Sequence, residues 1–301
     1  MSRRSPGQVR AASVRRTARP RKGLAQHFLT DHGALARIVD AAELGPDDIV
    51  IEVGPGRGVL TRALAARVRR VIAVELDAAL CRELEREMAA LGNVTIVQGD
   101  ILGTDVVALL SPSGGPPPPS GGPPPPYKVV ANIPYYITGA ILRFFLEAAR
   151  RPSRLVLLVQ KEVAQSVVAG PGEMSVIGVS VQLYGSPRIM GYVPAEAFRP
   201  PPKVDSAILR IDVYVKPAAG VRDTEAFFRI VRAGFSSRRK QIRNALANGL
   251  RVDVGLAGRW LVEAGLDPTR RPQMLLVEEW ARLTDVVRRH QGDQPAPNAT
   301  P

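Results

Sequence analysis

The chain has 301 residues, of which 45% are hydrophobic, so it is long enough for one large or two ordinary domains with a sizeable core. No apolar run reaches the length of a membrane span, and the basic N-terminus lacks the apolar stretch of a secretory signal. The single cysteine, Cys81, excludes an intramolecular disulfide, and three scattered histidines argue against a zinc site. We therefore expect a cytoplasmic monomer that binds no metal.

The net charge of +13 is concentrated in two segments. Residues 1–30 carry eight Arg or Lys and no acid, and residues 229–252 carry seven and no acid, so the rest of the chain carries about −2 by difference. Two basic segments on a nearly neutral body suit a polyanionic partner, above all a nucleic acid. Ordinary solvated faces of an arginine-rich chain are the alternative.

In chain order, residues 1–20 show no periodicity and are predicted to form a disordered basic arm. From there to residue 100, apolar strands alternate with amphipathic helices. The strands are predicted at 49–53, 71–75 and 94–100, and the helices at 32–44, 59–69 and 78–91. Because each strand is almost entirely apolar, both of its faces should be buried, which is typical of a parallel sheet covered by helices on both sides.

The middle of the chain contains a proline-rich segment. Residues 111–126 hold two runs of four prolines with Gly and Ser, which predicts an inserted surface loop, with a proline-rich ligand motif as the alternative. Further strands are predicted at 127–131, 154–160, Val176–Tyr184 and Ala207–Val215, with a helix at 138–150 and a rigid connector at Pro200–Pro202. After a boundary near residue 217 the pattern is helical, and residues 291–301 are predicted to be a disordered tail.

A glycine-rich turn, Gly54-Pro55-Gly56-Arg57-Gly58, follows the first of these strands and precedes a helix. Gly54 and Gly56 allow a ligand to approach the backbone, but the spacing matches neither a dinucleotide-binding turn nor a P-loop. Glu75 and Asp100 close the next two strands, where one carboxylate can hold ribose hydroxyls and the other can accept from an adenine amine. A structural turn with two helix caps is the alternative, but the combination favours a nucleoside-containing cofactor.

The string Asn132-Ile133-Pro134-Tyr135-Tyr136 follows the next strand, so it opens into the same crevice. The Asn132 side-chain oxygen and a backbone carbonyl can accept from an exocyclic amine, Tyr135 can stack on a base, and Pro134 stiffens the turn. Such a site suits the transfer of an activated methyl group, because the protein then has only to position the amine and orient its lone pair. An ordinary strand-to-helix turn is the alternative.

Together these motifs resemble those of the ribosomal RNA adenine dimethyltransferase family, and most closely its bacterial small-subunit (16S) enzymes. The resemblance runs from about residue 20 to 285 and is carried by segments 23–29, 52–58, 74–77, 99–100, 132–136, 160–164, 198–206 and 235–244. It implies a Rossmann-like class I methyltransferase sheet within residues 21–217 and a smaller all-helical RNA-binding domain at 218–290. The implied reaction is the S-adenosylmethionine-dependent dimethylation of two adjacent adenines in a 3′-terminal hairpin of 16S rRNA, on the immature small ribosomal subunit.

The resemblance also implies roles for individual residues. By position it places Asn132 and Pro134 at the methyl-transfer point, and it assigns the cofactor to His27, Leu29, Gly54, Gly56, Glu75, Asp100 and Asn132. Tyr135 and Phe198 would sandwich the target adenine, whose unstacking costs a few kcal/mol and whose stacking returns roughly 1–3 kcal/mol. Phosphate contacts must then supply much of the affinity, and these are predicted for Arg238, Arg239, Lys240 and Arg243.

Three features depart from the family pattern. Ala25 stands where Gly usually precedes Gln26, Tyr136 stands where many members have Asn, and the Pro-rich loop at 111–126 is unusual and is expected to lie near the cofactor side. Two other functions stay open: a large-subunit (23S) rRNA adenine methyltransferase of the macrolide-resistance type, and a non-catalytic RNA-binding factor in ribosome assembly. Segments 235–244 and 160–164 favour the small-subunit type, and the complete motif at 132–135 argues against a non-catalytic factor.

Overall fold

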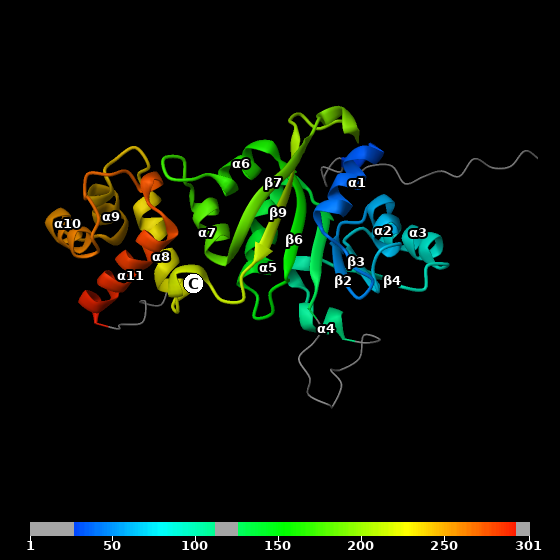
Figure 1. The fold of residues 1–301 in the computed structure, drawn as a ribbon, viewed down its shortest axis with the longest axis horizontal. Helices are drawn as coiled ribbons and strands as arrows, with labels where there is room; N and C mark the ends of the chain where they lie inside the picture. Colours follow the sequence, from blue (N-terminus) through cyan, green and yellow to red (C-terminus); the bar gives the residue numbers. More distant parts are fainter. Residues whose placement is uncertain (1–26, 112–125, 293–301) are drawn as a thin grey trace, which may run out of the picture.

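The computed structural model describes residues 27–111 and 126–292, and its centre is a seven-stranded sheet with the order β4-β3-β2-β5-β6-β9-β7 (Figure 1). Strands β4, β3, β2, β5 and β6 are mutually parallel, whereas β9 runs antiparallel to both of its neighbours. A separate two-stranded ribbon pairs β1 with β8. The strands are β1 Phe28–Leu29, β2 Ile49–Val53, β3 Arg70–Glu75, β4 Val94–Gln98, β5 Lys128–Asn132, β6 Arg154–Gln160, β7 Gly185–Val193, β8 Phe198–Arg199 and β9 Ser206–Val213.

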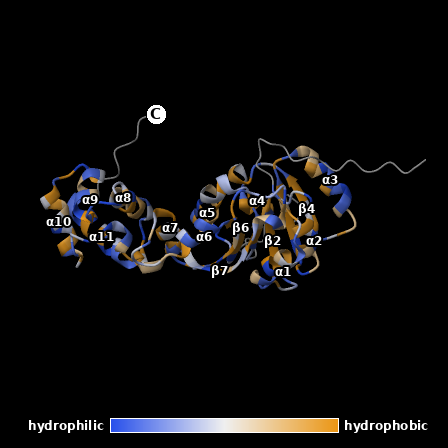
Figure 2. Cartoon of the chain, turned by 90° about the horizontal axis from the view of Figure 1, so that it is seen from above, coloured by the Kyte–Doolittle hydropathy of each residue, from blue (hydrophilic) through white to orange (hydrophobic). Residues whose placement is uncertain are grey.

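Helices cover both faces of this sheet, as predicted for apolar parallel strands (Figure 1). One buried cluster joins the sheet to α1 and α2, and a second, larger cluster joins it to α4, α5, α6 and α7. Figure 2 shows the apolar residues concentrated on the strands between these layers. The helices of this part are α1 His32–Ala41, α2 Val59–Ala65, α3 Ala78–Met88, α4 Val106–Leu110, α5 Thr138–Glu147, α6 Lys161–Val168 and α7 Val176–Tyr184.

The prediction of a strand at Val176–Tyr184 was wrong, because this segment is helix α7. Ser175 caps the helix through a hydrogen bond from the Gly178 N–H to its hydroxyl oxygen at 3.1 Å. The segment is apolar on most sides and largely buried, and periodicity alone does not separate a buried helix from a buried strand. The strand lies instead at β7, where Pro187 and several exposed residues mark an edge position and masked the pattern.

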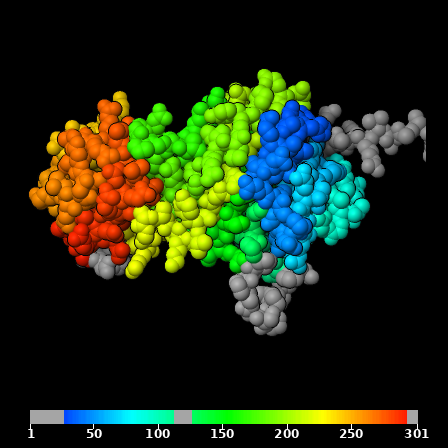
Figure 3. All heavy atoms as spheres, viewed as in Figure 1, coloured from blue at the N-terminus to red at the C-terminus, as the bar shows by residue number. Residues whose placement is uncertain are grey.

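The C-terminal region is helical, as expected. It contains α8 Thr224–Phe235, α9 Ile242–Leu250, α10 Val254–Glu263 and α11 Val277–Gln291, so the last helix extends slightly past the predicted start of the tail. Figure 3 shows these helices at one end of an elongated molecule. The larger buried cluster continues into them, since Tyr184 of α7 contacts Phe228 of α8 with ring centroids 6.3 Å apart. Four segments with sequence-based predictions lie outside the described residues: the arm at 1–20, residues 23–26, the Pro-rich loop at 112–125 and the tail at 293–301.

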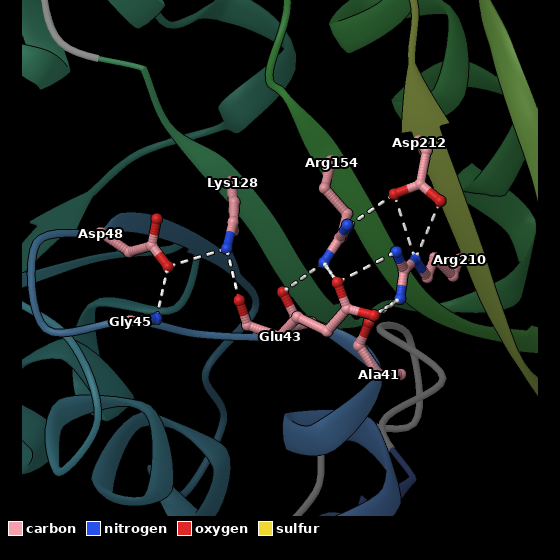
Figure 4. A network of polar contacts seen from close by, with 9 residues as sticks. Ala41, Glu43, Gly45, Asp48, Lys128, Arg154, Arg210 and Asp212 are labelled. Carbon is pink, nitrogen blue, oxygen red and sulfur yellow. Dashed lines mark hydrogen bonds and ion pairs between the residues drawn. The ribbon is translucent and has the colours of Figure 1, made fainter.

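A network of ion pairs ties the amino end of the parallel strands to the loop after α1 (Figure 4). Arg154 at the start of β6 contacts Glu43 at 2.8 Å and Asp212 of β9 at 2.7 Å. Arg210 of β9 contacts the same two carboxylates. Lys128 at the start of β5 contacts Asp48 at 2.8 Å. The Arg210 hydrogen bond, followed by that of Arg154, lowers the pKa of the Glu43 carboxyl to about 2.

Candidate active site

A cavity of about 410 Å³ opens at the carboxyl ends of β2, β3, β4 and β5. From β2 the chain continues to β3 on one side of the sheet, and it later returns to form β5 on the other side of β2. The position between β2 and β5 is therefore a topological switch point, where open parallel sheets bind ligands. Nine of the residues predicted for the site line this cavity: His27, Leu29, Gly54, Gly56, Glu75, Asp100, Asn132, Pro134 and Tyr135. The structure thus brings together side chains separated by more than a hundred positions in the sequence.

The glycine turn has the backbone that the sequence predicts. Gly54 and Gly56 have φ angles of +66° and +57°, in the left-handed region that other residues rarely adopt. A Cβ atom on Gly56 would lie 3.0 Å from the ring of Phe28 in β1, so the Phe28 side chain packs directly against the turn. The turn therefore has both the curvature and the close packing that exclude larger residues.

Glu75 is held rigidly at the end of β3. It is 5% exposed, and its two carboxylate oxygens accept from the Gly56 N–H at 3.2 Å and the Asp77 N–H at 2.9 Å. Burial raises the pKa of the Glu75 carboxyl, while the hydrogen bonds from Asp77 and Gly56 oppose that rise. Because each carboxylate oxygen has more than one lone pair, both can still accept from a ligand in the cavity.

Asp100 lies beyond the end of β4 and serves partly as a helix cap. One of its carboxylate oxygens accepts from the Leu102 N–H at 3.0 Å, at the start of a short 3-10 turn. This is the capping role that the sequence left open as an alternative. The side chain is exposed and also lines the cavity, so capping and ligand binding are compatible.

Glu52 is a cavity residue that the sequence analysis did not assign. It lies one residue before the end of β2, is 1% exposed, and its Oε2 has no hydrogen-bond partner among the described residues. Burial raises the pKa of the Glu52 carboxyl to about 8, and the neighbouring Thr61 hydroxyl opposes only part of this. A single acid inside the otherwise apolar string of β2 was the signal that could have identified it.

Asn132 presents its side-chain oxygen to the cavity. Its Nδ2 donates to the His27 carbonyl oxygen at 3.3 Å, and this bond fixes which end of the amide is the acceptor. Among the described residues, no donor reaches the Asn132 Oδ1. The half-buried amide therefore offers an open acceptor at the end of β5.

Tyr135 and His27 form an aromatic wall beside this acceptor. The Tyr135 hydroxyl lies 2.7 Å from the Ser206 hydroxyl at the start of β9, which fixes the outer end of the ring. The His27 ring lies 6.2 Å from the Tyr135 ring with an angle of 21° between their planes. Its Nδ1 lies 2.8 Å from the Pro200 carbonyl oxygen and donates to it. Both rings are thus positioned from two separate parts of the chain.

Phe198 is not part of this wall. Its side chain is fully buried in the cluster between the sheet and α1, and it is absent from the cavity lining. Its partner in the β1–β8 ribbon is Leu29, which does line the cavity. The structure therefore does not bring Phe198 and Tyr135 together as two faces of one slot.

The four predicted RNA-binding cations lie together on the helical region. Arg238, Arg239 and Lys240 form the turn between α8 and α9, Arg243 follows in the first turn of α9, and all four are exposed. Arg238 donates to the Met174 carbonyl oxygen at 3.4 Å, whereas the side chains of the other three have no hydrogen bond or ion pair with the described residues. Arg243 also lines a shallow groove with Arg259 of α10.

The family of the chain follows from comparison with known proteins. The family model for ribosomal RNA adenine dimethylase matches residues 17–282. This chain belongs to that family. An rRNA small subunit methyltransferase A of Dehalococcoides mccartyi is 47% identical over 270 residues, covering 89% of this chain and 88% of the relative. A protein of the same name from Moorella thermoacetica is 42% identical and covers 93% of this chain and 96% of the relative.

Two solved structures have a similar architecture. The 23S rRNA methyltransferase ErmE is similar with a TM-score of 0.66 and 30% identity, over 86% of this chain and 98% of that one. A dimethyladenosine transferase from Plasmodium falciparum has a TM-score of 0.67 at 24% identity, which shows the shared fold. The chain is thus an rRNA adenine dimethyltransferase with a class I methyltransferase sheet. Within its described residues no cluster of three potential metal ligands occurs, and no helix is long and apolar enough to cross a membrane.

Proposed function

We propose that this dimethylase uses S-adenosylmethionine to dimethylate the exocyclic amines of two adjacent adenines in a 3′-terminal hairpin of 16S rRNA. The reaction would take place in the cytoplasm on the immature small ribosomal subunit, as a step of its maturation. The observation that carries the proposal is the Asn132 amide, whose nitrogen is engaged by the His27 carbonyl and whose oxygen is left open in the cavity beside Tyr135.

The residues of the cavity fit the cofactor. Glu75 offers two buried, fixed oxygens to ribose hydroxyls, and Asp100 retains acceptor capacity for an adenine amine. The unpartnered Oε2 of Glu52 suits a hydrogen-bond donor or a cationic group of a ligand, since a buried carboxyl group without a partner is unfavourable. When bound, S-adenosylmethionine supplies an electrophilic methyl group on a sulfonium.

The protein then acts mainly by positioning. The Asn132 oxygen accepts one N–H of the adenine amine and thereby directs the nitrogen lone pair towards the methyl group. Tyr135 supplies a stacking surface for the base, and its bond to Ser206 anchors the outer end of the side chain. A sandwich with Phe198 requires that this buried side chain leave the core, whereas His27 already lies nearly parallel to Tyr135.

The helical region holds the RNA in this proposal. Arg239 and Lys240 are exposed and have no side-chain ion pair within the described part of the chain, so pairing with phosphates displaces no internal partner of theirs. Arg243 is also exposed, and its charge acts on the Asp267 carboxylate. Phosphate contacts of this kind provide affinity and position without reading sequence. They would supply the free energy that unstacking an adenine consumes.

The test is in vitro methylation of under-methylated small and large ribosomal subunits with labelled S-adenosylmethionine, followed by mapping of the modified bases. The proposal expects label on two adjacent adenines of 16S rRNA and none on 23S rRNA. Label on 23S rRNA alone would support the macrolide-resistance type, which the likeness to ErmE keeps as the second candidate. No label on either, together with no cofactor binding by calorimetry, would favour a non-catalytic assembly factor.

A further inference from the structure

Tyr136 is an exposed aromatic residue at the mouth of the cavity. Its side chain is 66% exposed, it belongs to the cavity lining, and it has no hydrogen bond among the described residues. The methyl-transfer chemistry described above does not use it. A large ring held in solvent beside a substrate site calls for an explanation that a scattered surface aromatic does not need.

The backbone makes Tyr135 and Tyr136 point in different directions. Both belong to a single 3-10 turn, Tyr135–Ile137, in which successive side chains are about 120° apart. Tyr135 is half-buried and bonded to Ser206, so its neighbour in the turn projects towards solvent. The next exposed residues, Gly139 and Ala140, are small, and a Cβ atom on Gly139 would contact nothing. Bulky neighbours in the first turn of α5 therefore do not cover the Tyr136 ring.

Two other tyrosines of similar exposure lack this combination. Tyr192 is 49% exposed, but its ring faces the Lys161 ammonium group at 5.3 Å and lies outside the cavity. Tyr214 is 41% exposed and follows β9 at the opposite end of the sheet. Among these three exposed rings, Tyr136 alone lines the cavity, next to the tyrosine that contacts the target base in the proposed function.

We propose that Tyr136 is a stacking platform for the nucleotide that adjoins the adenine in the cavity. An aromatic face accepts any base, since stacking does not depend on a particular hydrogen-bond pattern. With two adjacent target adenines, the one outside the cavity would stack on Tyr136 while the other is methylated. Tyr136 is thus a positioning residue for the RNA, and this inference rests on the proposed function.

The experiment uses the full chain and under-methylated small subunits assembled on 16S rRNA that carries one target adenine. The position next to that adenine holds either the second adenine, already dimethylated, or an abasic residue. Initial rates of methylation give kcat and KM for the wild type, Tyr136→Ala, Tyr136→Phe and the control Tyr214→Ala. Calorimetry gives the affinity of each variant for S-adenosylmethionine.

We expect Tyr136→Ala to raise KM for the adenine-flanked subunit by about 5- to 150-fold, the range for loss of one stacked base. The kcat and the cofactor affinity should stay near those of the wild type, because the lost contact is made equally in the ground and transition states. Tyr136→Phe keeps the ring and should behave as the wild type, and so should Tyr214→Ala. For the wild type, KM should be higher with the abasic subunit than with the adenine-flanked one. For Tyr136→Ala, KM should be nearly the same with both subunits, as expected when the ring and the base are the two partners of one contact.

Any of four outcomes would overturn the inference. Tyr136→Ala could retain a normal KM, it could lose affinity for the abasic and adenine-flanked subunits equally, or Tyr136→Phe could be as defective as Tyr136→Ala. A loss of cofactor affinity in Tyr136→Ala would place the residue in the cofactor site and overturn it as well. In each case a methylating wild type leaves the proposed function standing, whereas a wild type that labels neither subunit refutes the proposed function itself.

Discussion

At the amino end of the parallel strands the charged groups of the ion-pair network have partners (Figure 4), whereas at the carboxyl end two side-chain oxygens have none among the described residues. Arg210 bridges Glu43 and Asp212 at the first end. At the second end Glu52 has an oxygen without a partner, and the Asn132 oxygen faces the cavity without a donor.

The pKa values express the same difference. Hydrogen bonds from arginines hold the pKa of Glu43 at about 2, so this group favours the folded state in its charged form. Burial raises the pKa of Glu52 to about 8, so folding disfavours its charged form. One end of the sheet is arranged for stability, and the other retains unsatisfied groups that a ligand can satisfy. The predictions below separate these two roles.

The largest effect is expected from Asn132→Ala. Removing the only side-chain acceptor assigned to the amine should lower the single-turnover methylation rate by about 100- to 1,000-fold, as when one oriented polar group is lost from an active site. Cofactor affinity should change little, because Glu75 and Asp100 remain. Rapid-quench kinetics and calorimetry on the same variant measure both quantities. A near-normal rate would remove Asn132 from the reaction.

Arg210→Met should act on stability alone. Removing this 7% exposed guanidinium leaves Glu43 and Asp212 with Arg154 as their shared partner. We expect a loss of about 2–4 kcal/mol in the free energy of unfolding, less than for a fully buried pair because Glu43 is exposed. Urea denaturation measures it, and the methylation rate of the folded variant should be normal. Arg188→Met, an exposed arginine opposite Arg210 on β7, is the control and should be nearly silent.

Replacing Arg238, Arg239, Lys240 and Arg243 by Gln should weaken RNA binding through phosphates. The slope of log affinity against log salt should become shallower by roughly 0.7–0.9 per lost contact, and binding should weaken similarly for unrelated RNA sequences. Filter binding over a salt series measures the slope. Arg86→Gln on α3 is a control with the same chemistry outside this cluster. An unchanged slope would mean that the four cations are a solvated face.

Glu52→Gln should change the pH dependence of stability. Because the folded pKa of Glu52 is about 8 and the unfolded value about 4.5, the wild type loses stability as the pH rises through this window. Gln cannot ionise. The free energy of unfolding of Glu52→Gln, relative to that of the wild type, should therefore increase as the pH rises from about 4.5 to about 8. Denaturation of the cofactor-free proteins near pH 5 and pH 8 tests this. A difference that does not vary with pH would show that Glu52 does not titrate in this range.

Local patterns predicted most of the methyltransferase sheet. β2 and β6 begin and end where their apolar runs do, and the residues that follow β2, β3, β4 and β5 meet at one cavity because parallel strands share a carboxyl end. The pattern failed at α7, where a buried helix and a buried strand have the same composition. The strand β7 was missed for a different reason, since its exposed edge and its proline resemble a loop.

The site was harder to predict where tertiary contacts decide the role of a side chain. Glu75 and Asn132, which the sequence predicts for the site, both line the cavity. The sequence did not show that backbone N–H groups already hold Glu75 or that His27 orients the Asn132 amide. The family resemblance implies that Phe198 lies at the target base, whereas in this structure that ring is buried in the core, on strand β8 beside β1. Glu52 was overlooked because one acid in a strand does not reveal whether it faces a partner or a cavity.

The most direct test compares the two ends of the sheet in one measurement, the thermal midpoint of Arg210→Met and Glu75→Gln with and without saturating S-adenosylmethionine. A ligand that binds the folded state raises the midpoint, and the shift grows with the logarithm of the ligand concentration divided by its Kd. Arg210→Met should melt lower than the wild type and keep the full shift on adding cofactor. Glu75→Gln should melt close to the wild type and lose much of the shift, since a charge-assisted hydrogen bond to the ribose contributes about 1.5–3 kcal/mol. A normal shift in Glu75→Gln together with a lost shift in Arg210→Met would contradict the division of the sheet into a stabilising end and a ligand-binding end.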